Sequence, residues 1–148
     1  MNVVILGCGR MGANTALLMR RNGHNVTVID KDAASARRLG SEDMGDNFIV
    51  GNGLEIEVLE RAGLDKADAF VATTNYDNRN IMSSMLAKEH FNVPMVIARF
   101  YDSERAEIFS GLGIKTICVT SLGSGIAQDF ILGRGLRSID EYLSGARK

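Results

Sequence analysis

Three glycines near the N-terminus have the most informative spacing in the chain. The segment Gly7-Cys8-Gly9-Arg10-Met11-Gly12 directly follows an apolar run and precedes a stretch with helical periodicity. A G-x-G-x-x-G pattern alone is weak, but a position between an expected strand and an expected helix makes it more specific. There the first glycine forms a tight turn, the second lets the backbone approach a pyrophosphate, and the third lets the helix pack on the strand. The sequence therefore predicts a pyrophosphate loop at a helix N-terminus, against the alternative of a glycine turn without a ligand.

Asp30 is the second candidate side chain. It ends the apolar run Val26-Thr27-Val28-Ile29 and follows Gly12 by about the 20 residues expected of an acidic group that contacts a ribose. A carboxylate at this position accepts hydrogen bonds from the adenosine ribose and repels a 2′-phosphate. The spacing therefore favours NAD or ATP/ADP over NADP. In the alternative interpretation, Asp30 only caps the next helix.

Other residues are placed where they could support the same ligand. Arg10 lies in the glycine loop, where a guanidinium can reach phosphate oxygens in bidentate geometry, unless it is a solvated surface side chain. Cys8 lies close to a helix N-terminus, where a thiol pKa can fall, although it is more simply the variable residue of the loop. Two further segments, Gly51-Asn52-Gly53 and Thr73-Thr74-Asn75, each follow an expected strand. Both should therefore lie at the carboxyl edge of a parallel sheet, where such sheets bind ligands.

Short apolar runs alternate with longer helical segments along most of the chain. This alternation is typical of βα units around a parallel sheet, and mostly apolar strands imply that helices cover both faces. The predicted fold class is thus α/β, a Rossmann-like, doubly wound and mainly parallel six-stranded sheet. The expected strands are Asn2–Leu6, Asn25–Ile29, Asn47–Val50, Ala69–Ala72, Met95–Ala98 and Thr116–Val119.

Two of the expected helices have a recognisable apolar face. Between the fourth and fifth strands, the apolar residues at helical spacing are Ile81, Met82, Met85 and Leu86. They predict one buried stripe. In a helix expected to begin after Ser121, the corresponding residues are Leu122, Ile126, Phe130 and Ile131. Because the sheet is already covered at that point, this second stripe predicts a homodimer or higher homo-oligomer, unless the helix folds back on its own domain.

Composition limits the class of partner and the compartment. The 148 residues suit one domain, and 45% hydrophobic with 24% charged residues is ordinary for a globular protein. A net charge of −1 provides no basic field for nucleic acid. Cys8 and Cys118 are too few for a disulfide framework and lack metal-ligand spacing, which favours a reducing, cytoplasmic compartment. No apolar run reaches the roughly 18 to 20 residues of a membrane span, so any membrane role should be peripheral.

Taken together, these motifs resemble those of a known family. The chain resembles the N-terminal RCK (KTN) domain of potassium-transport regulators of the Trk/Ktr type, over nearly its whole length to about Asp129. The resemblance rests on the arginine after the second glycine, the D-x-D of Asp30-Lys31-Asp32, the segment from Asp68 to Asn80, and the strand ending Val96-Ile97-Ala98-Arg99. These features together are more specific than the glycine triplet.

The resemblance implies a cytoplasmic regulatory subunit that binds ATP, ADP or NAD(H) and controls a membrane-embedded potassium transporter or channel. Arg99 would sense terminal phosphates, with a capping or surface ion-pair role as the alternative. Asn52 departs from the aspartate usual in the family, which bears on the contacts to adenine. The residue patterns and the resemblance together predict these nucleotide-binding positions: Gly7, Cys8, Gly9, Arg10, Met11, Gly12, Asp30, Lys31, Asn52, Gly53, Thr73, Thr74 and Arg99.

The expected domain organisation is a Rossmann-type nucleotide-binding domain over residues 1–135 and a tail, or a truncated connection to a missing second domain, over residues 136–148. In the family a smaller ligand-binding domain usually follows, and this chain stops too early to contain it. The family helix that corresponds to residues 122–131 crosses to a neighbouring subunit. The resemblance therefore agrees with the prediction of self-association.

No group of residues suggests catalysis. The main alternative function is an NAD-dependent oxidoreductase, which needs a proton-transfer group near the nicotinamide. His24 lies in the turn before the second strand, His90 lies at a helix end, and a Tyr-x-x-x-Lys pair is missing. A methyltransferase shares the glycine loop and the acidic residue, but the third-glycine spacing and Arg10 favour a pyrophosphate ligand. We therefore predict a binding domain with no catalytic residue and no metal site.

Overall fold

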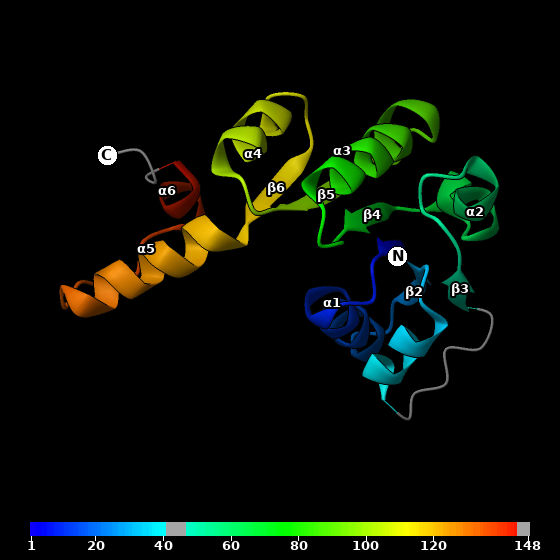
Figure 1. The fold of residues 1–148 in the computed structure, drawn as a ribbon, viewed down its shortest axis with the longest axis horizontal. Helices are drawn as coiled ribbons and strands as arrows, with labels where there is room; N and C mark the ends of the chain where they lie inside the picture. The colour runs from blue at the N-terminus through cyan, green and yellow to red at the C-terminus, as the bar shows by residue number, and fades with distance from the viewer. Residues whose placement is uncertain (41–46, 145–148) are drawn as a thin grey trace.

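The computed structural model describes residues 1–40 and 47–144. These residues form a six-stranded sheet whose paired strands are all parallel, in the order β3-β2-β1-β4-β5-β6 (Figure 1). The strands are β1 (Asn2–Leu6), β2 (Asn25–Asp30), β3 (Phe48–Val50), β4 (Ala69–Ala72), β5 (Met95–Phe100) and β6 (Lys115–Cys118). This is the strand order of the doubly wound dinucleotide-binding fold, so the predicted fold class is confirmed.

The order of strands reverses at β1. This central strand pairs with β2 on one side and with β4 on the other, and Val3 is in register with both Val26 and Ala69. The loops after β1 and β4 therefore leave the carboxyl edge of the sheet in opposite directions. That divergence opens a crevice at the edge, which is where sheets of this topology bind their ligands.

One face of the sheet is covered by α1 (Arg10–Arg21) and by the 3₁₀ helix η1 (Ala33–Leu39), as Figure 1 shows. Small side chains bring α1 close to the strands, because Ala13 and Ala16 are buried against the same apolar cluster as Ile5. Close packing of this helix fixes the position of its N-terminus relative to the end of β1. The glycine loop lies between them.

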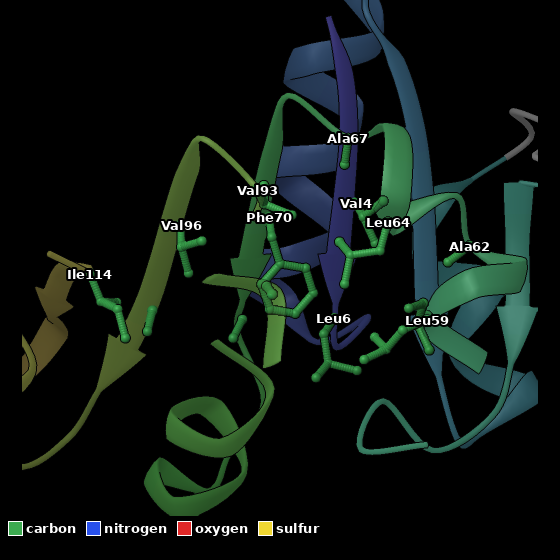
Figure 2. Close-up of a cluster of buried hydrophobic side chains, with 14 of the residues drawn as sticks. Val4, Leu6, Leu59, Ala62, Leu64, Ala67, Phe70, Val93, Val96 and Ile114 are labelled. Carbon is green, nitrogen blue, oxygen red and sulfur yellow. The ribbon is translucent and has the colours of Figure 1, made fainter. Parts of the chain in front are cut away.

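The opposite face carries the larger core. The elements that cover it are α2 (Ile56–Arg61), the short 3₁₀ turn η3 (Leu64–Lys66), α3 (Asp77–Met85), the π-helical turn η4 (Leu86–His90) and α4 (Ser103–Ser110). Figure 2 shows Phe70 of β4 within this core, together with Leu6 and Leu59. Burying side chains of this size contributes roughly 1.5–3 kcal/mol each. These contacts hold β4 in place and with it the residues at its carboxyl end.

The apolar stripe predicted for α3 is only partly correct. Ile81 and Met85 pack against the larger core, but Met82 is 55% exposed. Three positions of α3 with no exposed surface are instead polar, Asn80, Ser83 and Ser84. Polar groups can be buried when they are hydrogen-bonded, and Oγ of Ser83 donates to a helix carbonyl at 2.9 Å. Apolar periodicity alone therefore identified only part of the buried face.

α5 (Val119–Ile131) begins directly after β6 and extends away from the sheet, with α6 (Ile139–Ser144) beside it (Figure 1). The predicted end of the sixth strand at Val119 and the predicted helix start after Ser121 are therefore both wrong. Val119 is β-branched, so its propensity favours a strand, and its tertiary position overrides that preference. Within the described ranges, no helix is both long enough and apolar enough to cross a membrane.

A polar cluster holds α6 on α5. The carboxylate of Asp129, which is 1% exposed, accepts hydrogen bonds from Nε of Arg137 and Oη of Tyr142, both at 2.9 Å. The hydrogen bond from Arg137 holds the pKa of Asp129 below its usual value. Leu143 of α6 packs against the larger core. The first part of the predicted tail is thus docked on the domain, and its last residues, 145–148, lie outside the described part of the chain.

Candidate functional site

The glycine loop joins β1 to α1 at the carboxyl edge of the sheet. Gly7 has a φ of +97°, a conformation that L side chains rarely adopt, and its N–H donates to the carbonyl of Ile29 at 2.8 Å. A Cβ at Gly12, in the first turn of α1, would lie 1.9 Å from the carbonyl oxygen of Gly7. Around Gly9, by contrast, no heavy atom of the described residues other than Gly9 and its two chain neighbours lies within 4 Å of the place of its missing Cβ. The loop thus combines a tight turn, an open backbone surface and a close helix contact.

Thr73 supports the loop from the end of β4. Its N–H donates to the carbonyl of Leu6 at 2.8 Å, and its hydroxyl lies 3.0 Å from the carbonyl oxygens of both Leu6 and Gly7. A Cβ on Gly12 would also lie 2.6 Å from that hydroxyl. The side chain of Thr73 therefore fills the space between the two central strands and the start of α1, and it fixes the height of the loop above the sheet.

Asp30 occupies the end of β2, next to the glycine loop. One carboxylate oxygen accepts the backbone N–H of Cys8 at 2.6 Å, and the other accepts that of Asp32 at 2.9 Å. Each oxygen of an ionised carboxylate has a second acceptor position. Asp30 can therefore hold the loop and accept ribose hydroxyls at the same time. The alternative that Asp30 only caps the next helix does not hold. The residue that caps η1 is Asp32, whose side chain accepts the N–H of Ala34.

Cys8 is a buried residue of the loop. Its Sγ donates to the carbonyl of Ser35 at 3.4 Å, and its own carbonyl accepts from Nη1 of Arg38 at 3.3 Å. Burial raises the pKa of the Cys8 thiol. This direction is opposite to that of the lowered-pKa alternative considered for Cys8, because removal from water disfavours the charged thiolate. The side chain packs η1 against the loop.

Two adjoining pockets lie over the glycine loop. The first has a volume of about 170 Å³ and lies between the ends of β1, β2 and β4. The predicted nucleotide residues that line it are Gly7, Cys8, Gly9, Asp30, Lys31, Asn52, Gly53, Thr73 and Thr74. The second has a volume of about 440 Å³ and shares Gly9, Arg38 and Asn75 with the first.

The remaining predicted residues lie elsewhere around the loop. Arg10, Met11 and Arg99 line the second pocket, and Gly12 packs beneath the loop instead of lining either pocket. The sequence predicted a single site, and the fold distributes the residues of that site over two neighbouring pockets. Gly9 lies where the pockets meet, so a ligand that crosses its open backbone reaches both.

The second pocket is strongly basic. Its described lining includes three arginines, Arg10, Arg38 and Arg99, and no acidic residue. The guanidinium of Arg99 lies 4.4 Å from the centre of the Tyr101 ring, and Nη1 lies 3.5 Å from Oδ1 of Asn75. Its Nε is buried and has no hydrogen-bond partner in the described part of the chain. Its Nη2 donates to the hydroxyl of Tyr101. A guanidinium is a planar, charged fork of donors, and such a fork suits a phosphate group.

Sequence reasoning missed several residues of these pockets. Arg38 lines both pockets from η1, Arg79 and Tyr76 line the first, and Tyr101 lines the second. The pair Arg37 and Arg38 offers no sequence signal for choosing one over the other. Tyr76 and Arg79 fall in the segment that carries the family resemblance, which is the signal that could have found them. Among the described residues, no group of three or more His, Cys, Asp or Glu side chains could hold a metal ion.

The sequence is similar to sequences of potassium-uptake proteins. Residues 3–120 match the TrkA-N domain family. The Trk system potassium uptake protein TrkA of Streptomyces coelicolor is 44% identical over 117 residues, which cover 79% of this chain and 52% of that protein. The Trk system potassium uptake protein TrkA homolog of Methanothermobacter thermautotrophicus is 38% identical over 117 residues, which cover 79% of this chain and 53% of that protein. The chain thus spans about half the length of the curated relatives it matches.

The fold is similar to that of solved RCK domains. The crystal structure of the GsuK RCK domain matches with a TM-score of 0.76 and 21% identity, over 89% of this chain and 28% of that one. GsuK bound to ADP matches with a TM-score of 0.72 and 23% identity, over 88% and 33%. The GsuK channel bound to NAD matches with a TM-score of 0.73 and 22% identity, over 96% and 24%. At sequence identities of 21–23%, these similarities show a shared fold and nothing beyond it.

Proposed function

The chain belongs to the TrkA-N domain family, and from this membership we propose that it is a cytoplasmic, nucleotide-sensing regulatory subunit or domain. It binds ATP/ADP or NAD(H), and this binding controls a membrane-embedded potassium transporter or channel. The domain lies at the inner face of the membrane, where its partner holds it. Two observations support the proposal: the relatives are named as potassium-uptake proteins, and RCK structures of the same fold hold ADP or NAD.

The observation that carries the binding proposal is the polarity of the two pockets along the glycine loop. Asp30 lies at one end, where it can accept ribose hydroxyls. The open backbone of Gly9 lies in the middle, and Arg10 and Arg99 of the second pocket lie at the other end. An adenine nucleotide has the same order of groups, with hydroxyls on the ribose followed by phosphates. This match favours a pyrophosphate ligand over S-adenosylmethionine, which has no phosphate.

Thermal denaturation tests this proposal directly. We expect ATP, ADP, NAD or NADH to raise the melting temperature of the 148-residue chain, because a ligand at 100 times its Kd raises the free energy of unfolding by about 2.7 kcal/mol. S-adenosylmethionine is the comparison ligand, and we expect no shift with it. Stabilisation by S-adenosylmethionine alone, or by none of the nucleotides, would contradict the proposed function.

The placement of the histidines favours regulation over catalysis. Nδ1 of His24 lies 3.5 Å from the N-terminal amine, before the start of β2, and His90 contacts Phe91 before the start of β5. Both therefore lie at the amino edge of the sheet, opposite the pockets. A dehydrogenase needs a proton-transfer group beside the nicotinamide. The oxidoreductase alternative would require another residue to take that function.

Self-association is part of the proposal. Phe130 and Ile131 at the end of α5 are 67% and 83% exposed, and Leu136 and Ile139 add 63% and 66% exposed side chains nearby in the chain. Apolar surface of this extent usually marks an interface. We infer that this surface joins two copies of the chain, so that occupancy of one nucleotide site is communicated to a neighbour.

Light scattering on Phe130→Glu checks this inference. We expect a wild-type dimer or larger assembly and a monomeric variant, because a charge cannot be buried in an apolar interface without a partner. Gln128→Glu, on an exposed position of the same helix, is the matched control and should leave the assembly intact. A monomeric wild-type chain would remove self-association from the proposal.

We also propose that residues 1–135 form the nucleotide-binding domain and that residues 136–148 form a tail or a connection. The docking of α6 through Asp129, Arg137 and Tyr142 supports a connection with a fixed direction.

A further inference from the structure

Asn80 is a polar side chain with no exposed surface, in the first turn of α3. Its Oδ1 accepts the backbone N–H of Thr74 at 2.9 Å and the hydroxyl of Thr74 at 2.7 Å. Its Nδ2 donates to the carbonyl of Thr74 at 3.0 Å and to the carbonyl of Arg99 at 2.9 Å. Asn80 therefore joins the ends of two neighbouring strands, β4 and β5.

The side-chain amide of Asn80 is fully used. An amide has two acceptor positions and two N–H donors, and Asn80 employs all four. Aspartate has the same shape but no donor, so it would leave the carbonyls of Thr74 and Arg99 without their partner. A buried polar group that loses its partner is costly, which makes this arrangement specific for asparagine.

The two strand ends that Asn80 joins belong to different pockets. Thr74 lines the first pocket and Arg99 lines the second. The first turn of α3 makes a second connection to the same place, because the carboxylate of Asp77 accepts the backbone N–H groups of Tyr101 and Asp102, each at 3.0 Å. The backbone that carries Arg99 and Tyr101 is therefore held by α3 through two side chains.

The other side of the first pocket is held independently of α3. Asp30 is bonded to the N–H of Cys8, and Thr73 is bonded to the carbonyl of Leu6. Neither contact includes Asn80 or Asp77. A ligand confined to the ribose side and the glycine loop thus meets groups whose positions do not depend on the first turn of α3.

We propose that Asn80, with Asp77 as a second anchor, is a positioning residue that sets Arg99 at a fixed distance from the first pocket, so that ligands extending into the second pocket bind more tightly. This inference rests on the proposed nucleotide site and adds a determinant of selectivity to it. The ligands that depend on Asn80 are those with a phosphate chain or a second nucleotide beyond the α-phosphate. AMP, which ends there, depends on it little.

Titration calorimetry with ATP and AMP tests the proposal. We expect Asn80→Asp and Asn80→Ser to weaken ATP binding by about tenfold, which corresponds to one lost hydrogen bond to a charged group. AMP binding should change by less than about twofold. Ser83→Ala is the matched control, because Ser83 is equally buried on the same helix but bonds only within it. It should leave the ratio of ATP to AMP affinity unchanged.

A double-substitution cycle separates positioning from a general loosening of the fold. If Asn80 acts through Arg99, then in an Arg99→Ala background the Asn80 substitution should cost no further ATP affinity relative to AMP. Equal losses for ATP and AMP in the Asn80 variants, or full additivity with Arg99→Ala, would overturn the inference. Should both Asn80 variants fail to fold, Asp77→Asn must shift the ratio in the same direction, and an unchanged ratio overturns it. A wild-type chain that binds neither nucleotide would instead refute the proposed function.

Discussion

Replacing Gly12 with alanine is expected to lower the free energy of unfolding by about 3 kcal/mol or more, at the upper end of the cost of overpacking a core. The added Cβ would lie 1.9 Å from the Gly7 carbonyl oxygen and 2.6 Å from Oγ1 of Thr73. Neither neighbour can move away easily, because Gly7 is bonded to Ile29 and Thr73 is bonded to Leu6. The loss is a large part of the roughly 5–15 kcal/mol by which domains of this kind are usually stable.

Gly9→Ala is the matched control for this prediction. Its backbone has a φ of −74° and a ψ of −170°, which any residue can adopt, and the described structure leaves its Cβ direction open. The variant should therefore fold with near-normal stability. It should nevertheless lose most nucleotide affinity, because the methyl group occupies the place where the pyrophosphate would approach the backbone.

Thermal denaturation measures the stability of the two variants, and titration calorimetry measures their nucleotide affinity. The expected result is a destabilised Gly12→Ala protein and a stable Gly9→Ala protein that does not bind. A Gly12→Ala protein as stable as wild type would show that the loop is not packed as described. Tight ATP and NAD binding by Gly9→Ala would remove the glycine loop from the proposed site.

Asp30→Ala is expected to weaken ATP and NAD binding alike by about 1–3 kcal/mol, or roughly 5- to 150-fold. Both ligands contain an adenosine ribose, so the loss should be independent of the groups beyond the first phosphate. The substitution also removes the acceptor of the Cys8 N–H, which lies 2.6 Å from the carboxylate. Loosening of the glycine loop therefore adds to the loss of the ribose contact.

Asp68→Ala is the control for Asp30→Ala. The Asp68 carboxylate also accepts a backbone N–H at 2.6 Å, that of Asn2, but at the opposite edge of the sheet. The Asp68 substitution should lower stability without changing nucleotide affinity. Calorimetric titration of both variants compares the same lost contact inside and outside the nucleotide site. Unchanged affinity in Asp30→Ala would exclude Asp30 from the site.

The parts of the fold predicted well are those coded by short segments. β1 and β4 begin and end where the apolar runs of the sequence do, and the glycine loop lies between strand and helix as its spacing requires. Patterns of this kind report local conformation and burial on both faces. They say little about which loops meet at the sheet edge, which is why Arg38 and Tyr101 were not predicted.

The errors have a common physical origin in hydrogen-bonded burial and tertiary context. Asn80 looks like a surface residue in the sequence, yet it has no exposed surface and makes four hydrogen bonds to Thr74 and Arg99, which line the two pockets. Val119 reads as a strand residue, yet α5 begins there. Each outcome depends on residues distant in the sequence.

β1 pairs with β2 nearby in the chain and with β4 much further along it, so the two halves of the site depend on contacts of very different sequence separation. A unit of β1, α1 and β2 would present the glycine loop and Asp30 but lack Thr73, which supports that loop. Closing the long connection to β4 has an entropic cost before its contacts form, which makes it a late step. A nucleotide that needs both halves of the site would bind only the complete sheet. It would therefore change the unfolding rate, by slowing it, more than the folding rate.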